Sequence, residues 1–264
     1  MSIVLAALDT AAAARPVLET ALRIGQLTGA DVEAVHVSRG RLESIETPEL
    51  LAARSKVPFR LLEDPVEPAL LAALAAPEVL AGVIGARATP GGRRPVGRTA
   101  RYILEHANKP IVITPPDAIV PSSFRRILVP LEGTEASSRP VLEGLWPLLV
   151  ADVELVVLHV FTDATLPAML DRPEYDLEIW GREFLTRHLP HATHIELRPG
   201  PVAKQVAEVS GEHGVDLVVL SWSQDSSAGR AHVVWEVLGT SSVPVLLLPV
   251  TPVEIEDPVK GSSP

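Results

Sequence analysis

One segment of the chain combines the residue types that bind phosphate groups. It runs GARATPGGRRPVGRT from Gly85 to Thr99. Glycine lets backbone N–H groups approach an anion, and the four arginines supply positive charge. A helix is expected to begin within Gly97-Arg98-Thr99, where unpaired N–H groups and the helix dipole also attract negative charge. These features predict a phosphate-binding loop.

Asp9 is the acidic residue expected to lie across from this loop. It follows the apolar run 4–8, whereas the loop follows the run 79–84. If both runs are parallel strands of one open sheet, their carboxyl ends meet at the same edge, where such sheets bind ligands. A carboxylate there accepts hydrogen bonds from a ribose or a base. Asp9 and the loop together predict a nucleotide site.

Apolar runs and helical patterns alternate along the chain. Continuous Val, Ile and Leu runs are typical of strands buried on both faces of a parallel sheet, which helices then cover. Helices are expected over residues 14–28 and 202–213, ended by Gly29 and Gly214. The pattern predicts an α/β fold with an open, doubly wound sheet. The expected strands are residues 4–8, 32–37, 59–62, 79–84 and 111–114, then 127–131, 155–160, 194–197, 217–220 and 245–248.

The chain is one unit written twice. The pentapeptide RPVLE at residues 15–19 recurs at 139–143, and the apolar runs around it recur in the same order. A period of about 120 residues is far longer than that of solenoid repeats, so two duplicated domains are indicated. We expect a first domain at residues 1–116, a linker at 117–123, a second domain at 124–250 and a disordered tail at 251–264.

Composition restricts the partners and the setting. The chain has no cysteine, which excludes disulfides, thiolate metal sites and cysteine nucleophiles and suits a reducing compartment. The formal net charge of −10 argues against nucleic acid, whose phosphates bind clustered Lys and Arg. Neither a signal peptide nor an apolar run of about 20 residues is present, so no membrane partner is expected. We expect a cytoplasmic protein.

With these positions in place, the chain resembles the universal stress protein family over both copies. In that family the first strand ends in Asp, the second ends in Val, and the fourth leads into Gly-x2-Gly-x9-Gly-Ser/Thr before a helix. Asp9, Val37, Gly85 and Gly97 stand at those positions here. The resemblance implies two tandem Rossmann-like domains of the adenine nucleotide alpha hydrolase type, each with a five-stranded parallel sheet. It also implies ATP or AMP as the ligand, with no metal beyond nucleotide-bound Mg.

The resemblance also implies a role for each matched position. The adenosine would lie against Ala7 and Asp9, with Val37 lining the base pocket, and the phosphates would lie against Gly85, Gly97, Arg98 and Thr99. Arg87, one of the four loop arginines, is added to this predicted site for its positive charge.

The loop departs from the family pattern at two places. Ala88 replaces the second glycine, and its methyl group disfavours a positive φ. Eight residues, rather than the nine of the family pattern, separate Ala88 from Gly97. Arg98 replaces the small hydroxyl residue, which follows as Thr99. Arginine binds phosphate bidentately, so Arg98 favours phosphate binding, whereas Ala88 disfavours the loop conformation of the family. The alternatives are a nucleotide site and a solvated basic loop.

The second copy lacks the features of this site. Glu132 stands in place of Asp9, and the sequence SWSQ at 221–224 replaces the first glycines, with only residues 225–230 before the next helix. So short a loop does not surround a triphosphate. We interpret this copy as a degenerate, structural domain in which Trp222 and Trp235 pack.

The histidines and the remaining motifs indicate no catalytic centre. His188, His191 and His194 are spaced three apart, but Pro190 breaks the helix, so a surface connector is expected rather than a metal cluster. His36 and His159 occupy matching places in the second strands and are expected to be structural. No nucleophile elbow, His-Glu-x-x-His motif or paired-carboxylate signature is present, so no enzyme is expected.

Two functions remain open. One is a stress-response regulator whose first domain senses an adenine nucleotide. The other is an interaction or scaffold module without nucleotide that acts through an unknown protein partner. In either case the resemblance implies that the last strands of the two domains pair with each other, giving a pseudo-dimer within one chain. A further homodimer is an open alternative.

Overall fold

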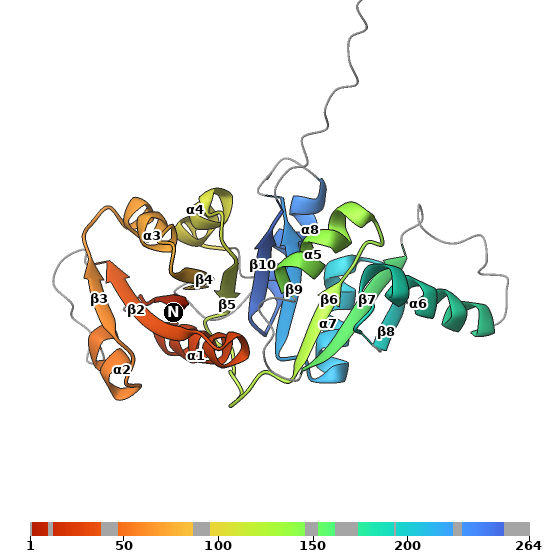
Figure 1. Ribbon diagram of the computed structural model, residues 1–264, viewed down its shortest axis with the longest axis horizontal. Helices are drawn as coiled ribbons and strands as arrows, with labels where there is room; N and C mark the ends of the chain where they lie inside the picture. Colours follow the sequence, from red (N-terminus) through yellow and green to blue (C-terminus); the bar gives the residue numbers. More distant parts are fainter. Residues whose placement is uncertain are drawn as a thin grey trace, which may run out of the picture.

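The apolar runs form one ten-stranded sheet in the computed structural model (Figure 1). The structure describes residues 2–9, 13–37, 47–86, 96–145, 153–161, 174–192, 194–223 and 229–250. All ten predicted strands are present, with ends within two residues of those expected. They are β1 Ile3–Ala7, β2 Asp31–Val37, β3 Phe59–Leu62, β4 Val79–Gly85, β5 Ile111–Thr114, β6 Arg126–Pro130, β7 Glu154–Phe161, β8 His194–Pro199, β9 Leu217–Trp222 and β10 Val245–Pro249.

The two halves of the sheet have the same strand order. The first half runs β3-β2-β1-β4-β5 and the second, from the other end, runs β8-β7-β6-β9-β10. Within each half every pairing is parallel, so each strand returns through a crossover connection. The predicted fold class, α/β with two tandem units of five parallel strands, is confirmed.

Helices cover both faces of the sheet, as a parallel sheet requires. Two predicted stop signals are confirmed, because Gly29 and Gly214 end their helices in the left-handed region, at φ 70° and 58°. The described helices are α1 Ala14–Thr28, α2 Pro48–Arg54, α3 Val66–Leu74, α4 Arg98–His106, α5 Glu135–Leu145, α6 Glu174–His188, α7 Val202–His213 and α8 Gly229–Thr240. In the parts of the chain that the structure covers, none of them is long and apolar enough to cross a bilayer.

The core consists of two apolar layers, one on each face of the sheet. One layer holds buried side chains of α1, α2, α5 and α6, such as Leu18 and Leu145. The other holds those of α3, α4, α7 and α8, such as Ile103 and Val237. Each layer therefore extends across both halves of the chain.

The two halves join where their last strands pair. β5 and β10 run antiparallel, with Val112 opposite Leu246 and Ile111 opposite Leu247. The expectation that these strands pair within one chain is confirmed. Beside this seam, the indole Nε1 of Trp222 donates to the Leu104 carbonyl of α4 at 2.8 Å. Trp222 is 3% exposed, so it packs, as predicted.

The connection between the halves runs from residue 115 to residue 125 and contains the predicted linker, residues 117–123. Ile119 in this connection is 93% exposed. The predicted tail, residues 251–264, lies outside the described residues.

Truncation of a seam leucine is expected to destabilise the whole molecule. Leu247 is 1% exposed and pairs across the seam, so Leu247→Ala should lower the free energy of unfolding by about 2–5 kcal/mol. The matched control is Leu50→Ala on α2, whose side chain is 49% exposed and whose loss should cost about 0.5 kcal/mol or less. Urea unfolding followed by circular dichroism measures both. Equal effects would show that the seam carries no special share of the stability.

Candidate functional site

The predicted site residues that the structure describes lie at the carboxyl edge of the first half of the sheet. Ala7, at the end of β1, lies between Val35 of β2 and Ile84 of β4. Just beyond the strand end, the Leu8 N–H donates to the Val35 carbonyl at 2.8 Å. The strands β1 and β4 are neighbours whose following helices, α1 and α4, lie on opposite faces. This is the switch point at which open α/β sheets bind ligands.

The exposure of these residues differs along the edge. Asp9 is exposed and Ala7 is half-buried, whereas Val37 at the end of β2 is only 8% exposed. A methyl group at Gly85 would make ordinary contacts of 3.5 and 3.6 Å with Val17 and Ala13, so packing does not require a glycine there. The edge therefore offers an acceptor and an apolar wall side by side.

The base of the predicted phosphate loop is closed by a hydrogen bond. The N–H of Gly97 donates to the carbonyl of Ala86 at 2.8 Å, which brings the end of β4 against the start of α4. Ala86 itself continues the sheet, because its N–H donates to the Thr114 carbonyl at 2.8 Å. The loop between them, residues 87–95, lies outside the described residues, and with it the predicted residue Arg87 and the substituted position Ala88.

Glu67 occupies the anion position at the start of α4. This residue lies in the first turn of α3, which begins at the same edge of the sheet. Its Oε1 lies 3.3 Å from Arg98 Nη2 and accepts a hydrogen bond from Thr99 Oγ1 at 3.1 Å. The Glu67 side chain is 16% exposed and that of Arg98 is 84% exposed. A phosphate that takes both Arg98 Nη2 and the Thr99 hydroxyl therefore displaces this carboxylate.

Glu67 was not among the residues predicted for the site. It lies more than 30 residues before Arg98 and belongs to no motif. One signal was available, because parallel strands place the starts of both following helices at the same edge.

The histidines of the two second strands make the same hydrogen bond. His36 Nδ1 lies 2.8 Å from the Leu8 carbonyl, and His159 Nδ1 lies 2.9 Å from the Leu131 carbonyl. A carbonyl only accepts, so both rings carry their proton on Nδ1. The prediction that both are structural is supported by this repeated contact. The Nε2 of His36 is buried without a hydrogen-bond partner among the described residues, close to the candidate site.

Aromatic rings surround the second of these histidines. The ring of His159 lies 4.9 Å from that of Phe161, 5.1 Å from that of Trp180 and 4.8 Å from that of Phe184. These rings come from β7 and α6. The second half thus packs aromatic rings around the residue that corresponds to His36.

The three histidines at 188, 191 and 194 were expected in a surface connector, and the structure places two of them differently. His188 is 7% exposed, contrary to the surface position expected for it, and its Nδ1 contacts Ser138 Oγ at 2.9 Å. The hydroxyl of this serine donates to the Thr134 carbonyl at 2.9 Å, so it accepts from the histidine in this arrangement. His194 instead contacts Glu196, on the far side of Pro190.

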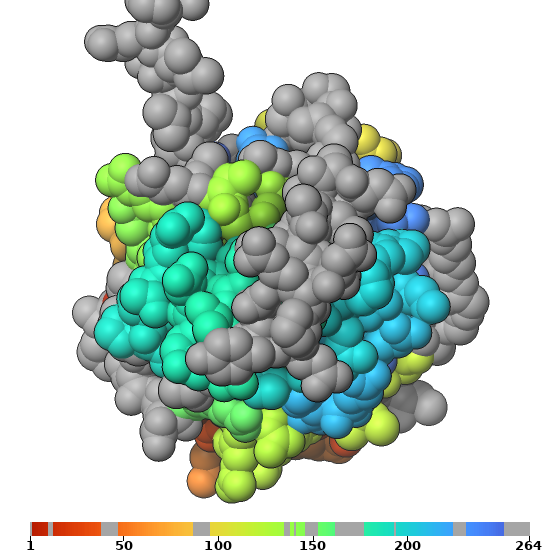
Figure 2. All heavy atoms as spheres, turned by 90° about the vertical axis from the view of Figure 1, so that its right-hand side faces the viewer, coloured from red at the N-terminus to blue at the C-terminus, as the bar shows by residue number. Residues whose placement is uncertain are grey.

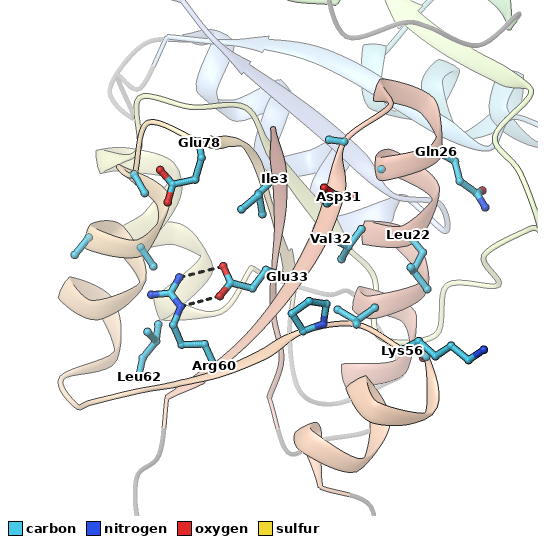
Figure 3. Close-up of a pocket in the computed structure, with 18 of the residues that line it drawn as sticks. Ile3, Leu22, Gln26, Asp31, Val32, Glu33, Lys56, Arg60, Leu62 and Glu78 are labelled. Carbon is cyan, nitrogen blue, oxygen red and sulfur yellow. Dashed lines mark hydrogen bonds and ion pairs between the residues drawn. The ribbon is translucent and has the colours of Figure 1, made fainter. Parts of the chain in front are cut away.

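A broad, open pocket of about 1390 Å³ lies at the opposite, amino-end edge of the first half (Figure 3). Its polar centre is a two-pronged ion pair in which Arg60 Nε and Nη2 donate to Glu33 at 2.8 and 3.2 Å. The hydrogen bond to Glu33 raises the pKa of Arg60. This internal pairing neutralises the pocket's central charges. None of the predicted site residues lines it.

Known proteins share this fold. Residues 123–249 match the model of the universal stress protein family. No curated protein matches the chain in sequence. Among solved structures, a functionally unknown protein from Pseudomonas aeruginosa matches with a TM-score of 0.68 and 14% identity, over 95% of this chain and 93% of that one. A universal stress protein from Archaeoglobus fulgidus matches with a TM-score of 0.66 and 17% identity, over 94% and 98%. At such identities the likeness establishes the shared fold.

Mild acid is expected to weaken the fold through its buried histidines. Burial lowers the pKa of His159 against the opposing effect of its backbone hydrogen bond, and burial also lowers the pKa of His188. The unfolded chain takes up these protons near pH 6.5, about the ordinary value. The stabilisation is therefore complete above that pH and is lost as pH falls toward the lower folded-state values. The free energy of unfolding should decrease from pH ~7.5 to ~5, by at most about 1.4 kcal/mol per pH unit for each histidine.

Urea titrations across this pH range test the assignment. His159→Gln removes one of the two groups, so its free energy of unfolding should depend less steeply on pH. His232→Gln is the control, because the His232 side chain is 75% exposed, and its pH dependence should equal that of the unmodified chain. Identical slopes in all three proteins would contradict a role for His159.

Proposed function

We propose that this chain, which belongs to the universal stress protein family through residues 123–249, is a stress-response regulator. Its first half binds an adenine nucleotide. Binding rather than catalysis is proposed, because the described residues at the carboxyl edge include no nucleophile paired with a base. The absence of cysteine from the chain supports a reducing compartment such as the cytoplasm as the setting.

One observation carries this proposal. The ends of β1, β2 and β4 and the start of α4 converge at the switch point of the first half. This convergence supplies an exposed carboxylate at Asp9 for a ribose or base and an apolar wall at Val37. The start of α4 supplies N–H groups and the guanidinium of Arg98 for phosphate. The second half presents no matching set among its described residues.

The Glu67 contact gives the proposed site a specific character. In the absence of ligand, the carboxylate of Glu67 neutralises Arg98 and holds Thr99. Bound phosphate replaces one anion by another at the same two groups. The free energy of binding is therefore reduced by that of the lost pair, so a weak affinity and a response to high nucleotide concentration are expected.

The same contact favours a second candidate function. If Glu67 remains in place, it already pairs with Arg98 and with the Thr99 hydroxyl, so these two groups are not committed to a ligand. The chain would then be an interaction or scaffold module that acts through a protein partner, and the proposed nucleotide site would be vestigial.

Calorimetric titration with magnesium-free ATP and AMP separates the two functions. Glu67→Gln removes the competing charge and should tighten binding by about fivefold, since an ion pair with an exposed arginine is worth up to about 1 kcal/mol. Arg98→Met removes a charge-assisted hydrogen bond to phosphate and should weaken binding by at least about tenfold.

The matched controls come from an ion pair of the same kind in the second half. Arg182 and Glu178 lie 2.8 Å apart on the exposed face of α6. Arg182→Met and Glu178→Gln should leave nucleotide binding unchanged. Absence of binding heat up to millimolar nucleotide in the Glu67→Gln variant would reject the nucleotide proposal and leave the scaffold function.

A further inference from the structure

Two histidines and a glutamate meet at the far edge of the second half. His194 and Glu196 are two residues apart on β8 and so face the same side of the strand. His213 is the last residue of α7. Glu196 Oε1 lies 2.9 Å from His194 Nε2 and 3.1 Å from His213 Nε2. Figure 1 shows α7 beside β8, and Figure 2 faces this end of the molecule, with α6 and α7 on its surface.

These three atoms form the donor set of an open transition-metal site. Two imidazole nitrogens and a carboxylate oxygen, with a fourth position left to water, are a common three-ligand arrangement for zinc. At metal–ligand distances near 2.0–2.1 Å, tetrahedral ligands lie about 3.3 Å apart. The two N···O distances are already close to that value, and all three ligand atoms lie within 4.8 Å of one another. The His194 side chain is 42% exposed, which leaves a path from solvent.

Neighbouring residues fix the orientation of the ligands. Arg198 Nε donates to the other oxygen of the carboxylate, Glu196 Oε2, at 3.0 Å, which leaves Oε1 for the two histidines. Arg198 is itself held by Glu212 at 2.6 Å. The end of α7 is also held, because Arg126 Nη1 donates to the His213 carbonyl at 2.8 Å. Such outer contacts are the means by which proteins hold metal ligands in place.

We propose that His194, Glu196 and His213 bind a divalent first-row transition ion with one coordination position open to solvent. Each imidazole gives its Nε2 lone pair and keeps its proton on Nδ1, and Glu196 gives Oε1. Histidine nitrogen with a single carboxylate suits zinc and its neighbours better than the all-oxygen ligand sets of Mg²⁺ or Ca²⁺. The site is independent of the proposed nucleotide site, since it lies on the other half of the chain.

The competing account is an ion-pair cluster without metal. In that arrangement both Nε2 atoms carry protons and share one carboxylate oxygen, and Arg198 completes the charge balance. The two accounts differ in one measurable respect. Only the metal site has a saturable affinity for a transition ion.

Zinc titration of the untagged chain tests the proposal. We expect one Zn²⁺ per chain by calorimetry, and His194→Gln and His213→Gln should each weaken its binding by at least about tenfold, since even outer-shell changes cost 10–100-fold. Co²⁺ should give the visible absorption of a low-symmetry, four-coordinate ion, and both variants should lose it.

His232→Gln is the matched control. His232 and Glu236 also form a histidine–carboxylate pair, at 3.4 Å on α8. Among the described residues, this pair does not belong to a group of three possible metal ligands. This variant should bind Zn²⁺ as the unmodified chain does. Circular dichroism without metal verifies that every variant is folded. Failure to saturate at one Zn²⁺ per chain, or equal affinity in all four proteins, would overturn the proposal and leave an ion-pair cluster.

Discussion

Antiparallel pairing of β5 with β10 is the constraint on which the rest of this structure depends. Each five-stranded half would otherwise end in an apolar strand with unpaired backbone groups, and such an edge associates with other chains. Joined at Ile111 to Ile113 and Val245 to Leu247, the halves share one sheet and two continuous apolar layers. The order of strands within the first half then places the switch point between β1 and β4 one strand away from the seam strand β5.

Much of this fold is predictable because buried parallel strands leave a clear mark in the sequence. Runs of Val, Ile and Leu located every strand, and Gly29 and Gly214 located two helix ends through their backbone conformation. The duplication identified two histidines as structural, because a residue that the fold requires is expected at the same position in both copies. His36 and His159 reach the same carbonyl position in their respective halves.

The arrangement of charges was less predictable because it depends on contacts between distant elements. Glu67 meets Arg98 only because α3 and α4 begin at one edge. The predicted strand 194–197 already separated His194 from His188, but the meeting of His194 with His213 through Glu196 depends on how α7 packs against β8. Periodicity within one element describes that element alone. The pairing of side chains from separate elements follows from the tertiary structure.

The contact between Trp222 and α4 links the candidate site of one half to the interior of the other. Helix α4 begins at Arg98 and, two turns later, offers its Leu104 carbonyl to the indole of Trp222. Between these points, the guanidinium of Arg101 lies 5.5 Å from the ring centre of Trp235, and the two tryptophans meet edge to face. A displacement of α4 along its axis therefore alters the surroundings of both indoles. The molecule contains its own optical reporter, in which the fluorescence of one half records the position of a helix in the other.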